Sequence, residues 1–228
     1  MGGGAIFISG SHRPLLKAKV PPGLTFSCNI QQYLDGQLST GNSNGKGNEM
    51  FCGKLFRSGK YYCLTNANSG LACGRMKIFM RYGVMDKLLH LTCVADLSGS
   101  DCDDTTMQNS LDLIKKNESV LLPDGLFGLR TRRPRRVTTS TIAHGSTRVV
   151  ESGPYQVPFG GVGRSLTPSR KNVVLESPNP SATETEWSDE YFPPFQLGKI
   201  NEDLFSIDFS HLSPVMAFAI ALAIFHQS

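Results

Sequence analysis

Alternation of apolar and polar residues recurs along this chain in short segments separated by turn residues. Candidate strands of this kind lie at residues 24–33, 50–55, 60–64, 76–82 and 87–95. Gly, Asn, Ser and Asp residues separate several of them, as expected for strands joined by tight turns or loops. The pattern therefore predicts a mainly β fold built from many short antiparallel strands.

The C-terminal segment has a different pattern. Residues 196–209 predict two short alternating strands with a turn between them, and residues 215–225 are apolar at every position after Pro214. A helix that is apolar all round has to be buried on all sides. This one is too short to cross a bilayer, which needs about 20 apolar residues. The chain is therefore predicted to surround its own C-terminal helix with a closed or nearly closed shell of strands.

The remaining segments fit one domain. Residues 1–22 contain several Gly and Pro residues and predict a weakly ordered lead-in, followed by a barrel domain over residues 23–228. Residues 107–116 predict either a helix or a strand and loop. Residues 151–190 are rich in Gly, Pro and Ser and predict a loop or poorly ordered insertion, with one apolar patch at residues 173–175.

Composition supports this interpretation. The chain has 228 residues, 39% of them hydrophobic and only 18% charged, with 23 Gly and 13 Pro. This balance suits a loop-rich β protein with one sizeable core. The N-terminus lacks the basic region and long apolar stretch of a signal peptide. None of the six cysteines forms a Cys-x-x-Cys pair, so free thiols in a reducing compartment are favoured over a zinc site or a disulfide framework.

Charge is unevenly distributed along the chain. Residues 130–136 contain five arginines, which are Arg130, Arg132, Arg133, Arg135 and Arg136. Residues 176–208 contain eight acidic residues and a single lysine. Since the net charge is only +4, the arginine run alone accounts for its positive sign. A basic run of this kind attracts phosphates, either of lipids or of nucleic acids.

No pattern typical of an enzyme is found in the sequence. The five histidines are scattered, and His90 lies within an apolar segment, where a structural role is favoured. Residues 101–104 are acidic but lack the spaced ligands of a calcium loop. Residues 160–163 are glycine-rich but lack the strand and helix that flank a nucleotide-binding loop. We therefore predict no catalytic residue, no metal and no cofactor.

The C-terminal pattern resembles the signature of the tubby-like proteins. That family ends with a Gln-Phe-Gly-Lys/Arg-Val strand, an Asp-x-Phe-x-Met-Asp-Tyr strand and a Gln-Ala-Phe-Ala-Ile-x-Leu helix. Residues 196–199, 203–209 and 216–222 are the counterparts here, in the same order and spacing. The resemblance implies a closed antiparallel β-barrel around a buried C-terminal helix. The family's Phe-x-Gly-Arg strand has no clear counterpart, so the resemblance implies a divergent member or an incomplete one whose barrel lacks strands.

A second resemblance concerns a pair of cations. Residues 53–58, Gly-Lys-Leu-Phe-Arg-Ser, resemble the family's Gly-Lys-Leu-Arg-Ser element, whose Lys and Arg bind the head group of phosphatidylinositol 4,5-bisphosphate. The resemblance implies Lys54 and Arg57 as head-group ligands. Two residues separate them here, whereas one separates them in the family. In a flat strand they would point to opposite faces, and a bulge or the end of the strand would be needed to bring them together.

The arginine run resembles a third family element, Leu-Gly-Phe-Lys-Gly-Pro-Arg-Lys-Met. The resemblance implies that Arg130, Arg132, Arg133, Arg135 and Arg136 form a second phosphate contact at the membrane surface. Each cation near an anionic leaflet contributes about 1 kcal/mol. A nuclear-import or nucleic-acid patch and a solvated basic loop are the alternatives.

The resemblance implies a non-enzymatic, phosphoinositide-binding adaptor that associates with the plasma membrane from the cytoplasm as a monomer. It further implies a second location in the nucleus, protein cargo, and a link to membrane-protein trafficking or transcription regulation. The alternative is a nucleic-acid-binding or transcription-associated β domain that uses residues 130–136. A third hypothesis is a compromised paralogue with no ligand.

Overall fold

The computed structural model describes residues 3–8, 14–20, 26–33, 49–66, 74–84, 88–97, 103–116, 120–132, 135–143, 146–156, 167, 169–179 and 192–227. Side chains are described in most of these segments, whereas residues 3–8, 14–15, 33, 49, 66, 135–143 and 146–156 are described by their backbone alone. Within these residues no helix is both long and apolar enough to cross a membrane.

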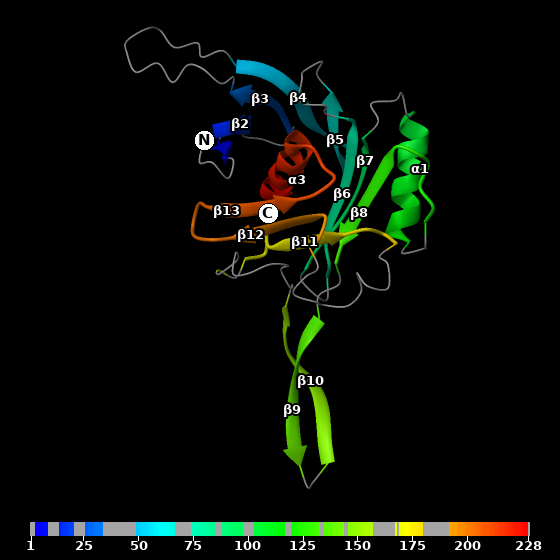
Figure 1. Ribbon diagram of the computed structural model, residues 1–228, viewed down its shortest axis with the longest axis vertical. Coiled ribbons are helices and arrows are strands. Elements are labelled where there is room, and N and C mark those ends of the chain that lie inside the picture. The colour runs from blue at the N-terminus through cyan, green and yellow to red at the C-terminus, as the bar shows by residue number, and fades with distance from the viewer. Residues whose placement is uncertain are drawn as a thin grey trace.

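Eleven strands form one antiparallel sheet that follows chain order (Figure 1). They are β1 (Gly3–Ile8), β2 (Pro14–Val20), β3 (Ser27–Tyr33), β4 (Glu49–Ser58), β5 (Tyr61–Asn66), β6 (Met76–Tyr82), β7 (Leu89–Asp96), β8 (Leu126–Thr131), β11 (Val173–Glu176), β12 (Phe195–Lys199) and β13 (Phe205–Phe209). A separate hairpin, β9 (Arg135–Ala143) and β10 (Ser146–Gln156), extends away from this sheet. The predicted mainly β, antiparallel fold is confirmed.

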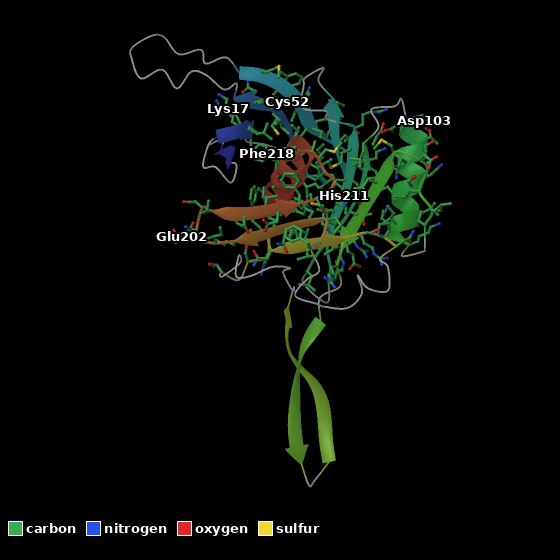
Figure 2. All side chains as sticks on the ribbon, in the orientation of Figure 1. Lys17, Cys52, Asp103, Glu202, His211 and Phe218 are labelled. Carbon is green, nitrogen blue, oxygen red and sulfur yellow. The ribbon has the colours of Figure 1, made fainter. Side chains whose placement is uncertain are left out.

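The C-terminal helix α3 (Pro214–Gln227) lies inside the curve of the sheet, as Figures 1 and 2 show. Ser213 precedes Pro214, and its Oγ accepts a hydrogen bond from the backbone N–H of Met216 at 3.2 Å. A serine cap followed by proline at the first helical position is a favoured helix start. Every residue from 215 to 224 is buried, which confirms the prediction of an enclosed helix.

The prediction of a closed barrel is wrong in one respect. Among the described strands no pairing joins β1 to β13, so the sheet wraps around α3 but stays open between its two end strands. The helix can still be covered because burial requires side chains around it rather than a continuous ladder. The ring of Phe205 on β13, for example, packs edge-on against Phe225 of α3, with centroids 4.9 Å apart.

The first 22 residues differ from the predicted weakly ordered lead-in, because they contain the paired strands β1 and β2. Leu16 and Ala18 of β2 are buried in the main core. They alternate with Lys17 and Lys19, which is the period-two pattern of a strand with one buried face.

Helix α1 (Asp104–Lys115) packs on the outer surface of the sheet, against β6, β7 and β8. Met107, Leu111 and Ile114 form a second, smaller core there. Of the two alternatives for residues 107–116, the structure has the helix, which begins three residues earlier because Asp103 caps it. The Asp103 Oδ1 atom accepts a hydrogen bond from the backbone N–H of Thr106 at 2.7 Å.

The segment 151–190, predicted as a loop or insertion, contributes in part to the fold. Residues 151–156 complete β10, and the apolar patch at 173–175 forms β11, which pairs with both β8 and β12. Residues 157–166, 168 and 180–191 lie outside the described residues. The short strand β11 thus links the N-terminal and C-terminal parts of the sheet.

Candidate functional site: a cationic pocket beside helix α1

A pocket of about 250 Å³ lies on the outer face of β4, β5 and β6, next to the first turns of α1. Figure 2 places Asp103, the residue that caps α1, at this end of the helix. The pocket is lined by Phe56, Ser58, Tyr61, Cys63, Leu64, Thr65, Arg75, Met76, Lys77, Asp104, Met107 and Gln108.

Strand alternation decides which side chains face this pocket. On β5, Tyr62 and Leu64 are buried in the main core around α3. Their neighbours Tyr61 and Cys63 therefore point to the opposite, outer face. On β6 the same rule applies, since Ile78 is buried in the main core and Lys77 points outward. The pocket floor is therefore a direct result of the period-two sequence pattern.

Two cations meet one carboxylate in the pocket. The Lys77 Nζ atom lies 3.1 Å from Asp104 Oδ2, and Arg75 Nη2 lies 3.8 Å from Asp104 Oδ1. The Lys77 ammonium also lies 5.5 Å from the centre of the Tyr61 ring, a cation–π distance. Two positive groups thus share this one carboxylate.

Polar groups extend along α1 from the pocket. The Gln108 Nε2 atom donates hydrogen bonds to Tyr61 Oη at 3.1 Å and to Asp112 Oδ2 at 2.9 Å. The hydrogen bonds from Gln108 and Lys115 lower the pKa of the Asp112 carboxyl, which therefore stays ionised. Helix α1 is thus fixed to β5 through Tyr61 by a polar contact as well as by its apolar core.

The structure separates Lys54 and Arg57, the two predicted head-group ligands. Strand β4 pairs with β5 in unbroken register from Gly53 to Ser58, so residues three apart point to opposite faces. The only irregularity between β3 and β4 in the described register falls before Lys54, where Ile30 pairs with Gly53 and Gln31 with Phe51. It therefore does not bring the two cations together.

Each of the two cations has its own surroundings. Lys54 is exposed on the outer face, and its backbone carbonyl accepts a hydrogen bond at 3.3 Å from Thr65 Oγ1, a pocket residue. Arg57 lies on the side of Tyr62, with its guanidinium 5.9 Å from that ring, and its Nε donates to the carbonyl of Gly59 at 3.1 Å. Lys54 therefore shares the face of the pocket and Arg57 does not.

Arg57 lies near the contacts that hold the end of α3. The Tyr62 hydroxyl is 2.7 Å from His226 Nδ1 and donates a hydrogen bond to Gln227 Oε1 at 3.1 Å. Burial and the nearby Arg57 charge lower the pKa of His226. The half-buried His226 ring also packs against the rings of Phe26 and Tyr62, and these contacts anchor the helix end.

The predicted arginine patch is divided by the fold. The Nε atoms of Arg130 and Arg132 lie 3.4 and 3.6 Å from the two carboxylate oxygens of Glu176. Arg132 is 6% exposed, so its guanidinium is largely withdrawn from the surface. Arg133 lies outside the described residues, and the side chains of Arg135 and Arg136 on β9 do as well.

Sequence reasoning missed the residues that converge on the pocket, which are Arg75, Lys77, Asp104 and Gln108. The sequence did offer a signal for Lys77, because this residue alternates with core residues of β6. That pattern predicts a cation on the outer face of the strand. Of the acidic segment 101–104, residues 103 and 104 are described, and Asp103 and Asp104 belong to the start of α1. Within the described residues no group of three His, Cys, Asp or Glu side chains is arranged to hold a metal.

Comparison with known proteins adds one finding. Residues 150–227 match the model of the Tub family. Comparisons with curated proteins and with solved structures gave no significant match. The matched segment includes β12, β13 and α3, the elements that carry the C-terminal sequence resemblance, and also β11. The C-terminal third of the chain is therefore similar to the Tub family.

Proposed function

We propose that this protein is a non-enzymatic phosphoinositide-binding adaptor that recognises a lipid head group in the pocket beside α1. The observation that carries the proposal is the convergence of Lys77 and Arg75 on one carboxylate, at 3.1 and 3.8 Å. An ammonium supplies a point charge and a guanidinium a planar set of donors, and together they suit a phosphate group.

The surroundings of this pair support binding of an anion. Lys54 is exposed on the same outer face, where its strand neighbour Thr65 lines the pocket. The first turn of α1, which begins at Asp104, adds the partial positive charge of a helix N-terminus. The match of residues 150–227 to the Tub family model favours phosphatidylinositol 4,5-bisphosphate as the ligand. Lys54, rather than Arg57, is the sequence-predicted ligand that this site retains.

The proposed setting follows from the ligand. A protein that binds this lipid through a surface pocket acts at the inner face of the plasma membrane, as a peripheral and monomeric adaptor. Release from the lipid would return it to the cytoplasm or allow it to enter the nucleus. Its partners would be membrane-protein cargo, in keeping with a role in protein trafficking or transcription regulation.

The nucleic-acid alternative relies on the arginine run at residues 130–136. Glu176 contacts two of its guanidinium groups, which reduces the charge that the run offers to a phosphate backbone. The pocket cations therefore support the lipid function better than the described arginines support binding of DNA or RNA.

The test is co-sedimentation with three vesicle types: neutral, phosphatidylserine, and phosphatidylinositol 4,5-bisphosphate at matched total charge. We expect wild-type protein to pellet selectively with the bisphosphate. Arg75→Gln with Lys77→Gln should weaken this binding about 30-fold, since each cation contributes about 1 kcal/mol, or about five-fold. Arg81→Gln is the matched control, because Arg81 is an exposed cation of β6 that does not line the pocket.

Three results would contradict the proposal. Equal pelleting with any anionic vesicle would show a non-specific cationic surface. Retained selectivity in the double variant, with thermal melts confirming that it folds, would place the head group elsewhere. Binding to DNA or RNA that falls steeply with salt, in place of lipid binding, would favour the nucleic-acid alternative.

A further inference from the structure

We propose that Asp104 acts as an intramolecular competitor for the anion, so that its carboxylate occupies the phosphate position and has to leave when a ligand binds. This inference rests on the proposed function of the pocket, since it concerns how that same site is regulated. It assigns to Asp104 a role that lowers affinity, in contrast to the neighbouring cations.

The geometry of the ion pairs carries this assignment. The Asp104 carboxylate contacts Lys77 with one oxygen and Arg75 with the other, which is how a phosphate would bridge the two cations. The Lys77 side chain is only 10% exposed and packs near the Tyr61 ring. The Asp104 side chain is 71% exposed and so is the member of the cluster with the most room to turn into water.

The start of α1 does not depend on the Asp104 side chain. Asp103 is the cap, and its two carboxylate oxygens accept hydrogen bonds from the backbone N–H and the hydroxyl of Thr106, at 2.7 and 3.0 Å. Asp104 follows as the first helical residue, and its carboxylate makes the two ion pairs described above. Rotation of this side chain into water would break those ion pairs without removing the cap.

The exchange favours ligands that carry more charge than a carboxylate. A phosphate monoester has about −1.5 to −2 charges at neutral pH. It therefore interacts with Lys77 and Arg75 more strongly than the single negative charge it displaces. A singly charged anion gains little from the same exchange. Asp104 thus makes the pocket bind phosphate monoesters in preference to singly charged anions.

The experiment is a calorimetric titration of the full chain with soluble inositol 1,4,5-trisphosphate at constant ionic strength. Asp104→Asn should bind about two- to five-fold more tightly than wild type, because a partly exposed ion pair contributes up to about 1 kcal/mol. Asp124→Asn is the matched control. It removes the same charge from an exposed turn outside the pocket and should leave the affinity unchanged. Adding Lys77→Gln to Asp104→Asn should abolish the gain.

The outcomes separate this inference from the proposed function. Wild-type binding with no gain in Asp104→Asn would overturn the competitor role and leave the pocket function standing. An equal gain in both Asp→Asn variants would reduce the effect to net charge and also overturn it. No binding by either wild type or Asp104→Asn would refute both proposals. Binding by Asp104→Asn alone would establish the competitor role in its strongest form.

Discussion

Replacement of Phe218 by alanine tests whether the sheet truly encloses α3. Phe218 is 2% exposed and lies midway along the helix, where Figure 2 shows it inside the sheet. Truncation of a buried phenylalanine to alanine costs about 3–5 kcal/mol, because it removes apolar contacts and leaves a cavity. The total free energy of unfolding of a domain is only about 5–15 kcal/mol. The variant should therefore lose a large share of its stability.

The assay is urea unfolding followed by circular dichroism, with a thermal melt alongside. In a domain of this size each kcal/mol lowers Tm by about 2–4 °C, so we expect a fall of roughly 6–20 °C. Phe192→Ala is the matched control, because the same atoms are removed from a side chain that is 48% exposed. It should change stability by about 0.5 kcal/mol or less. Equal losses in the two variants would refute the enclosure of α3.

Three further predictions concern other parts of the molecule. Gly74→Ala should lower the free energy of unfolding by about 1–3 kcal/mol in urea, because the Cβ of the new alanine would lie 1.5 Å from the carbonyl oxygen of Asp96. An unchanged urea midpoint would contradict this packing. Lys54→Ala should weaken binding to bisphosphate vesicles about five-fold, whereas Arg57→Ala should leave the binding unchanged. Weaker binding by Arg57→Ala with unchanged binding by Lys54→Ala would instead place the site on the face of Arg57. Burial raises the pKa of the Cys28 thiol from 9.0 to about 11. The thiol therefore ionises first in the unfolded state, and the free energy of unfolding should fall as pH rises from 9 to 11. A Cys28→Ala variant should show a smaller fall, and a fall equal to that of wild type would exclude Cys28 as the cause.

The enclosed helix was the part of the fold most predictable from sequence. An all-round apolar segment too short for a bilayer has few alternatives to burial, and residues 215–224 are buried as predicted. The β1–β2 hairpin was missed because nearby Gly and Pro residues outweighed the short alternation around Leu16 and Ala18. Closure of the sheet was over-predicted because hydrogen bonding between its two end strands depends on long-range register, which local periodicity does not encode.

The candidate site was predictable only in part, for a related reason. The alternation of side chains along a regular strand predicted that Lys54 and Arg57 would face opposite sides, and the unbroken register of β4 agrees. It did not reveal the cluster of Arg75, Lys77 and Asp104, because Asp104 lies on α1, 27 residues after Lys77. Their meeting depends on the packing of α1 against β6.

The most direct test of the proposed site is an NMR titration of isotope-labelled protein with inositol 1,4,5-trisphosphate, followed through assigned amide resonances. We predict that the largest shifts occur at Thr65, Lys77 and Gln108, which line the outer pocket. Shifts confined to Arg57, Tyr62 and the end of α3 would contradict the proposed site, because they would place the anion on the opposite face of the sheet.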